Sequence, residues 1–242
     1  MSGPLDLHTL LKAYAIGVFP MADDRDAPDV YWVEPRKRGI LPLDQFHLSR
    51  SLRKTIRSDR FETTFNTAFA DVLNACAEPT EDRPGTWINR QIEDAVLRLH
   101  ALGHAHSVET WFEGRLVGGL YGISLGRAFF GESMFSRMTD ASKVALAHLV
   151  ARLRTGGFTL LDCQFQTPHL ESLGAIEISR EDYSVALSAA LSGGGGGPLS
   201  TADGDLGALD RVDAPPASSP RATIVSGPIS GCRILQALTQ TS

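Results

Sequence analysis

The chain of 242 residues has few cysteines and no long apolar run, and these two features limit the classes of protein to which it can belong. Its three cysteines, Cys76, Cys163 and Cys232, lie far apart and form no CxxC pair. This spacing predicts reduced thiols and gives no metal-binding signature. No stretch approaches the roughly 20 apolar residues that span a bilayer, and the first residues lack a basic region followed by an apolar core. We therefore expect a cytoplasmic protein without a membrane partner.

Charge is unevenly distributed along the chain. The net charge is −5, which by itself argues against a nucleic-acid partner. Between residues 36 and 60, however, eight basic residues are opposed by only two acidic ones, a local charge of +6. Four basic residues follow Ser49 at helical spacing: Arg50, Arg53, Lys54 and Arg57. This helix face could contact phosphates, and a solvated surface helix is the alternative.

Composition divides the chain into four parts. Residues 1–46 are expected to form a small N-terminal domain and residues 47–192 a larger α+β domain. Residues 193–223 begin with five consecutive glycines and contain few large apolar side chains, which predicts a flexible linker. Residues 224–242 regain apolar character and either dock onto the body or form a free tail.

One amphipathic helix is predicted to begin after Thr139 and Asp140, which are candidate N-caps. Leucine or valine recurs at i, i+3, i+4 and i+7, at positions Leu146, Leu149, Val150 and Leu153. Gly156 and Gly157 end the pattern. Before this helix, residues 107–112 and 116–123 alternate polar and apolar side chains around Glu113 and Gly114, which predicts an antiparallel strand pair.

Two carboxylates lie on either side of this helix in apolar surroundings. Alternation in the strand expected over residues 158–165 would place Asp162 and Gln164 on one face and Cys163 on the other. Glu132 lies between Gly131 and a Met-Phe pair. A carboxylate on an apolar face either borders a cleft or binds a partner. The sequence therefore indicates an active site here, and the alternative is a buried aspartate that ties strands together.

Six short sequences occur together in an order and spacing found in one protein family. They read GVFP, GTWI, LGHAHSVE, GGLYG, FGESMFS and DCQ, beginning at Gly17, Gly85, Leu102, Gly118, Phe130 and Asp162. Over about residues 9–184 the chain thus resembles the leucyl/phenylalanyl-tRNA protein transferases. The resemblance implies a small N-terminal domain on a GCN5-related acetyltransferase-like domain, with a mixed sheet flanked by helices. The composition after residue 192 adds a flexible C-terminal extension to this expected α+β fold.

The resemblance also implies an activity. Such an enzyme moves Leu or Phe from charged tRNA to the α-amino group of proteins with N-terminal Arg or Lys, which marks them for N-end degradation. It needs no metal and no cofactor. The implied catalytic residues are Asp162, Gln164 and Glu132, and the two carboxylates would favour a cationic acceptor. Asp162 would act as a base or orient the attacking amine.

Further positions follow from the same resemblance. The donor side chain would occupy an apolar pocket lined by Leu120, Met134, Leu146, Leu149, Leu153 and Leu161. Trp32 or Trp87 would stack on the terminal adenosine. The chain reads Tyr31-Trp32-Val33 where the family has a tryptophan pair, which leaves open the ring that stacks. The basic residues after Ser49 match the family's tRNA-contacting face.

The sequence also allows three other interpretations. An acyl-CoA-dependent N-acetyltransferase would need a glycine-rich phosphate turn, whereas residues 136–140 contain no glycine and end in an acid at the helix cap. A non-catalytic tRNA-binding module would leave Glu132 and Asp162 unexplained. A hydrolase using Cys163 and His169 is disfavoured because alternation turns Cys163 away from the expected cleft.

Overall fold

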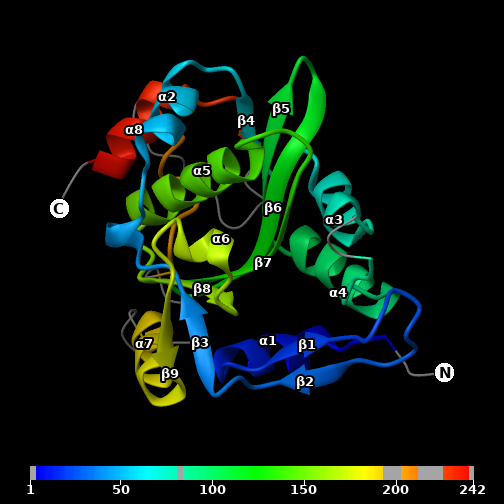
Figure 1. The fold of residues 1–242 in the computed structure, drawn as a ribbon. Helices are drawn as coiled ribbons and strands as arrows, with labels where there is room; N and C mark the ends of the chain where they lie inside the picture. The colour runs from blue at the N-terminus through cyan, green and yellow to red at the C-terminus, as the bar shows by residue number, and fades with distance from the viewer. Residues whose placement is uncertain (1–3, 81–83, 193–202, 212–225, 240–242) are drawn as a thin grey trace.

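The computed structural model describes residues 4–80, 84–192, 203–211 and 226–239. Seven of its strands form one sheet: β3 Lys37–Ile40, β4 Glu62–Phe65, β5 Ala105–Phe112, β6 Arg115–Leu125, β7 Ala128–Ser136, β8 Leu160–Gln164 and β9 Ile176–Ser179. Their order is β4-β5-β6-β7-β8-β3-β9 (Figure 1). The pair β7 and β8 is parallel and the other neighbours are antiparallel.

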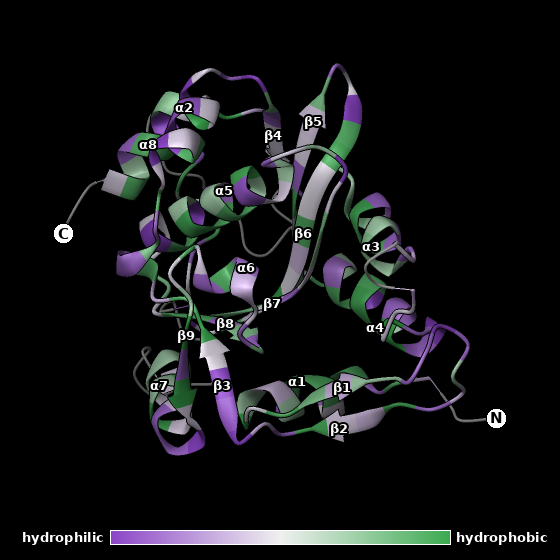
Figure 2. Ribbon diagram, in the orientation of Figure 1, coloured by the Kyte–Doolittle hydropathy of each residue, from purple (hydrophilic) through white to green (hydrophobic). Residues whose placement is uncertain are grey.

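Helices cover both faces of this sheet. One face carries α2 Arg50–Arg57, α5 Ala141–Thr155 and α8 Gly231–Thr239, and the other carries α3 Phe69–Ala77 and α4 Arg90–Ala101 (Figure 1). The short elements η1 Leu43–Gln45 and α6 Pro168–Glu171 and the helix α7 Arg180–Ser192 complete this part. Figure 2 shows that α2 carries both hydrophilic and hydrophobic residues, and its buried side chains are Leu52 and Ile56.

A small N-terminal part lies beside the sheet. It consists of α1 Leu7–Ala15 and a separate antiparallel pair, β1 Phe19–Met21 and β2 Tyr31–Val33. β3 comes next in the sequence but pairs with β8 and β9 in the main sheet. The α+β class predicted from the sequence, with a mixed sheet, flanking helices and a small N-terminal part, is confirmed. None of the described helices has the length and apolar character to cross a bilayer.

The predicted helix and hairpin at the centre of the chain are both present. Residue Asp140 is the N-cap of α5, and Gly156 is its C-cap. Glu113 and Gly114 join β5 to β6 with φ angles of 50° and 71°, as a tight hairpin turn requires. The strand expected over residues 158–165 is shorter, because β8 ends at Gln164.

The GGLYG sequence lets α5 approach the sheet closely. A Cβ atom at Gly118 would lie 2.6 Å from the Ala141 Cβ and 2.9 Å from the Ala141 carbonyl carbon. Separations below 3.0 Å require the backbone to move, so only glycine fits between β6 and the first turn of α5. This contact places the apolar side chains of α5 directly over the central strands.

The C-terminal segment is anchored by a fully buried arginine on α5. The Arg152 guanidinium donates to both carboxylate oxygens of Asp210, at 2.6 and 2.7 Å, and to the Leu206 carbonyl at 2.6 Å. It also donates to the Ser226 hydroxyl, and its Cζ lies 4.1 Å from the centre of the Phe65 ring. Apart from Phe65, the partners of Arg152 are Leu206, Asp210 and Ser226, which all lie toward the C-terminal end of the chain.

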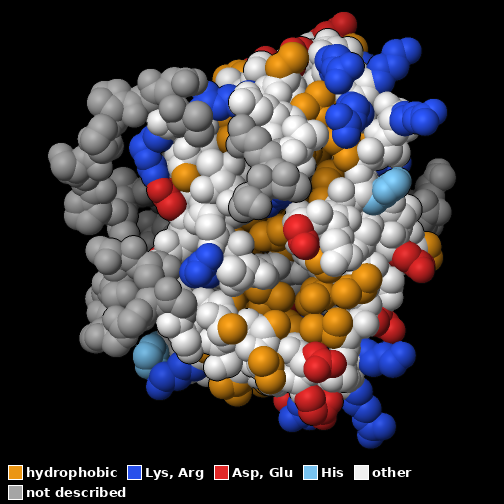
Figure 3. All heavy atoms as spheres, turned by 90° about the vertical axis from the view of Figure 1, so that its left-hand side faces the viewer, with side chains coloured by type: hydrophobic (Ala, Val, Ile, Leu, Met, Phe, Trp, Pro, Cys, Tyr) orange, Lys and Arg blue, Asp and Glu red, His pale blue; other side chains and the backbone are white. Residues whose placement is uncertain are grey.

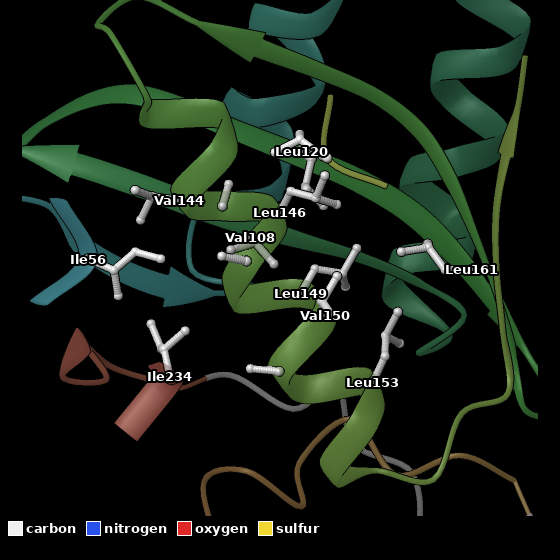
Figure 4. Packing of buried hydrophobic residues seen from close by; sticks show 14 of the residues in the cluster. Ile56, Val108, Leu120, Val144, Leu146, Leu149, Val150, Leu153, Leu161 and Ile234 are labelled. Carbon is white, nitrogen blue, oxygen red and sulfur yellow. The ribbon is translucent and has the colours of Figure 1, made fainter. Parts of the chain in front are cut away.

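Apolar contacts complete the attachment of this segment. Leu206 and Leu209, within the stretch expected as a linker, are buried in the core around α5. Residues 193–202 and 212–223 of that stretch lie outside the described residues. Of the two alternatives for the last residues, α8 docks: Ile234 and Leu235 are buried, and Figure 4 shows Ile234 near Ile56 of α2.

Replacing Ile234 with Ala should lower the free energy of unfolding by about 2–5 kcal/mol, because it removes a buried side chain and leaves a cavity. Denaturant unfolding measures the change. Gln236→Ala, at an exposed position of the same helix, is the matched control and should change stability by less than about 0.5 kcal/mol. Equal stability of Ile234→Ala and the unmodified chain would contradict the docking of α8.

Candidate active site

A cavity of about 370 Å³ opens between α5, β7, β8, α6 and the N-terminal part. This volume is within the range of small-molecule pockets. Its apolar lining comprises Phe19, Met21, Trp87, Leu120, Tyr121, Met134, Leu146, Leu149, Leu161, Cys163, Phe165 and Leu170. Its polar side chains are Glu132, Ser133, Gln164, Thr167 and His169. A mostly apolar chamber with a few polar groups is typical of a ligand site.

The structure brings together most of the side chains expected to form the pocket. Leu120, Met134, Leu146, Leu149 and Leu161 all line the cavity, and Figure 4 shows four of these leucines converging from α5 and the strands. Leu153 was expected with them but is buried in the core and does not line the cavity. It lies one further helical turn along α5, past the end of the cavity.

The two tryptophans expected near the donor lie in different places. Trp87 lines the cavity together with Phe19, Met21 and Phe165. Trp32 lies on β2, where 41% of the residue is exposed, and it does not line the cavity. The structure therefore associates Trp87, and not Trp32, with the chamber.

Glu132 lies on β7 at the polar end of the cavity. Its Oε1 atom accepts hydrogen bonds from the Tyr14 hydroxyl at 2.9 Å and from the Gln164 side-chain amide at 3.3 Å. Burial raises the pKa of Glu132 to about 8; the Tyr14 hydrogen bond lowers it, the Asp162 charge raises it and the Arg38 charge lowers it. At neutral pH the Glu132 carboxyl group is thus mostly neutral.

Asp162 is fully buried and faces away from the cavity. Its Oδ1 and Oδ2 atoms accept from the Arg38 guanidinium at 2.8 and 2.6 Å, and Oδ2 also accepts from the Tyr183 hydroxyl at 2.8 Å. Arg38 donates further to the Gly17 carbonyl at 2.9 Å, and its Cζ lies 4.6 Å from the ring centres of Phe19 and Tyr183. The ion pair is thus almost fully satisfied.

Gln164 reaches the cavity through a backbone turn that the alternation argument missed. Its φ angle is +56°, and the Phe165 N–H donates to the Cys163 carbonyl at 2.6 Å across it, which makes a γ-turn. The Gln164 N–H in turn donates to Asp162 Oδ1 at 2.8 Å. The prediction that Asp162 and Gln164 share one face was therefore wrong, because the strand ends in this turn.

Gly39 of β3 provides the space for this turn. A Cβ atom there would lie 2.7 Å from the Phe165 carbonyl carbon and 2.7 Å from the Gln166 nitrogen. Gly39 is the β3 residue in register with Gln164. A larger residue would displace the γ-turn, which makes this glycine a steric requirement of the site.

Cys163 was expected to point away from the cleft, but it lines the cavity. Leu161 and Cys163 share the cavity face of β8 by ordinary alternation, while Asp162 occupies the other face, where it pairs with Arg38. Burial, followed by the Asp162 charge, raises the pKa of the Cys163 thiol well above its usual value. A protonated thiol is a weak nucleophile, so the hydrolase reading is still disfavoured, now for this reason.

Three contributors to the site escaped the sequence reasoning. Tyr14 lies on the same face of α1 as Leu10, and its position in the sequence is typical of a core residue. Arg38 belonged to a basic run and was counted with surface charge, although it is 2% exposed. Tyr183 lies on α7, for which no helix was predicted. None of these positions carries a local signal, because each is defined by contacts with distant segments.

The predicted basic helix face is exposed on α2. Arg50, Lys54 and Arg57 are exposed and Arg53 is half-buried. Within the part of the chain that the structure describes, none of these four residues forms an ion pair. On the face shown in Figure 3, Lys and Arg side chains gather at upper right, with exposed hydrophobic side chains below them. This surface suits an anionic partner.

Known proteins resemble this chain along nearly its whole length. A family model described as leucyl/phenylalanyl-tRNA protein transferase matches residues 40–188, and one for the N-terminal domain of that protein matches residues 3–36. A leucyl/phenylalanyl-tRNA protein transferase from Rhizorhabdus wittichii is 61% identical over 249 residues, which cover 98% of this chain and 99% of that protein.

Further relatives carry the same name. The protein from Zymomonas mobilis is 64% identical over 79% of this chain and 72% of its own length. That from Paramagnetospirillum magneticum is 61% identical over 78% of this chain and 90% of its own. The solved structure of L-PGS from Bacillus licheniformis matches 68% of this chain and 55% of its own, with 13% identity and a TM-score of 0.37. From its family matches and full-length relatives, the chain belongs to the leucyl/phenylalanyl-tRNA protein transferase family.

Proposed function

We propose that this protein transfers leucine or phenylalanine from charged tRNA to the α-amino group of proteins that begin with arginine or lysine. The observation that carries the proposal is the cavity, where an apolar chamber adjoins the polar pair Glu132 and Gln164. The chamber suits a Leu or Phe side chain, and an ionised carboxylate suits a cationic one. The product would be a protein marked in the cytoplasm for N-end degradation.

In the proposed reaction, the α-amino nitrogen of the acceptor attacks the carbonyl carbon of the aminoacyl ester. A C–N bond forms and the C–O bond to the terminal ribose breaks. The amine loses a proton and the released ribose oxygen gains one. Because the ester is already activated, the protein must mainly hold the two substrates in line and provide for the proton transfer.

Gln164 is the residue best placed to hold the reacting groups. Its side chain reaches the polar end of the cavity, where its amide contacts Glu132. Asp162 is a positioning residue in this proposal, since Arg38, Tyr183 and the Gln164 N–H occupy its two oxygens. Of the two roles expected for Asp162, these contacts favour orientation of the site over general-base catalysis.

Glu132 is proposed to select the acceptor. It is the carboxyl group in the lining of the cavity, and its two hydrogen-bond donors, Tyr14 and Gln164, are both neutral. A cationic side chain in the cavity would stabilise the charged form of Glu132. The acceptor would therefore be chosen by the sign of its first side chain.

The nucleic-acid side of the site is proposed to involve α2 and Trp87. Arg50, Arg53, Lys54 and Arg57 would contact backbone phosphates, and Trp87 in the cavity wall would stack on the terminal adenosine. The charged tRNA would then span from the basic helix to the chamber that takes its amino acid.

The proposal is tested by incubating the purified protein with radiolabelled leucyl-tRNA or phenylalanyl-tRNA and peptides that differ only in an N-terminal Arg, Lys, Asp or Ala. We expect label on the Arg and Lys peptides, because their side chains complement Glu132. Transfer to the Asp peptide would contradict the carboxylate account of selection, and no transfer to any peptide would contradict the reaction itself.

Replacing Gln164 with Ala should lower kcat by about 10²-fold, because it removes the side chain that aligns the substrates. The Kd for charged tRNA should stay unchanged. Gln166→Ala is the matched control, since the Gln166 amide donates to the Ala175 carbonyl and does not line the cavity. If both variants retain the full rate, Gln164 has no part in catalysis.

Acceptor binding should depend on pH through Glu132. Its pKa of about 8 leaves it mostly neutral at pH 7 and mostly ionised at pH 9, so the affinity for an Arg-initiated peptide should rise about tenfold over this interval. Glu132→Gln keeps the shape but cannot ionise, and it should remove that rise. Calorimetry without tRNA measures both proteins with the same peptide, whose own α-amino titration then cancels in the comparison. Equal pH profiles would exclude Glu132 from acceptor binding.

A further inference from the structure

The start of α5 lies beside the basic helix α2, and further along α5 Leu146 and Leu149 line the cavity. Asp140, the N-cap residue of α5, accepts from Lys143 Nζ at 3.1 Å through one oxygen and from the Thr55 hydroxyl of α2 at 3.5 Å through the other. Lys143 thus lies beside α2 and keeps part of its surface exposed, with 36% of its side chain accessible. Its ammonium has three donors, and the contact with Asp140 uses one of them.

His169 provides a second polar side chain, at the cavity itself. It comes from α6, lines the cavity and is exposed. Among the described residues its imidazole makes no hydrogen bond. Partial burial, and then the Lys143 charge, lowers the pKa of His169. The lowered pKa favours the neutral imidazole at pH 7, and a neutral imidazole has one N–H available as a donor.

We propose that Lys143 and His169 bind backbone phosphates of the single-stranded 3′ end of tRNA and lead it from α2 into the cavity. This inference rests on the proposed function, since it concerns the same donor. An aminoacyl group in the chamber and a duplex on α2 require the last nucleotides to cross the surface between them. The ammonium and the imidazole N–H supply donors along that crossing, and the Lys143 contact offsets the charge of Asp140.

The test compares two aminoacyl donor substrates that differ in phosphate content. Phenylalanyl-tRNA carries the whole 3′ strand, whereas adenosine esterified with phenylalanine has no phosphodiester. We expect Lys143→Gln and His169→Gln each to raise KM for phenylalanyl-tRNA, by about tenfold for the loss of one charge-assisted contact at Lys143. Transfer from the adenosine ester should stay unchanged in Lys143→Gln, because Lys143 does not line the cavity. Lys143→Arg keeps the charge and should restore most of the affinity.

The salt dependence of tRNA binding gives a second readout that needs no minimal donor. Lys143→Gln should reduce the slope of log Kd against log salt concentration by about 1. Lys12→Gln is the matched control: it removes the same charge from an exposed position on α1 and should leave the slope as it is.

Each contrary outcome is distinguishable. An unchanged KM in both variants, or an unchanged salt slope in Lys143→Gln, would overturn the phosphate path, as would an equal loss with both donors in Lys143→Gln, which would mean damage to the chamber. Failure of the unmodified protein to transfer from either donor would contradict the proposed function, and the phosphate path with it.

Discussion

The buried ion pair between Arg38 and Asp162 is the contact on which the rest of the site depends. Burying two charges carries a large desolvation penalty, which is offset only when geometry and hydrogen bonding are nearly complete. Here the pair is bidentate, and Tyr183, the Gly17 carbonyl and the Gln164 N–H take up further bonds. One cluster therefore joins β3, β8, α7 and the loop after α1. The same carboxylate also holds Gln164 in its left-handed turn, so the attachment of the N-terminal part and the geometry of the cavity share one origin.

The N-terminal part also completes the cavity directly. Tyr14 of α1 donates to Glu132, and Phe19 and Met21 of β1 line the chamber. Burial, followed by the Glu132 charge, raises the pKa of Tyr14 well above its usual value, so its hydroxyl is a donor over the whole range of neutral pH. The carboxyl group of Glu132 is thus held by a hydrogen bond from a residue about 120 positions away in the sequence. A chain without its first helix would have an open cavity and an altered Glu132.

Local patterns in the sequence predicted the parts of the fold that local patterns determine. The periodicity of α5, its capping residues and the Glu113-Gly114 hairpin are confirmed. The apolar positions expected to form the pocket, other than Leu153, line the cavity. β3 was not predicted because it has four residues and lies between strands from the other end of the chain. The cavity face of β8 was assigned wrongly because Asp162 pairs with Arg38 on the other face, and Gln164 reaches the cavity only through a positive φ angle. A backbone angle that depends on Asp162 and Gly39 leaves no periodic signal.

The anchoring of Arg152 has a consequence for the synthesis of the protein. This arginine belongs to the central helix, but its carboxylate, carbonyl and hydroxyl partners come from residues 206, 210 and 226. A ribosome completes α5 well before it adds these residues. Until then the guanidinium has the Phe65 ring beside it but lacks these hydrogen-bond partners, and an uncompensated buried charge costs about 3–5 kcal/mol. The helix consequently cannot settle onto the sheet in its final form during elongation, and maturation of the active site must wait until the end of the chain emerges.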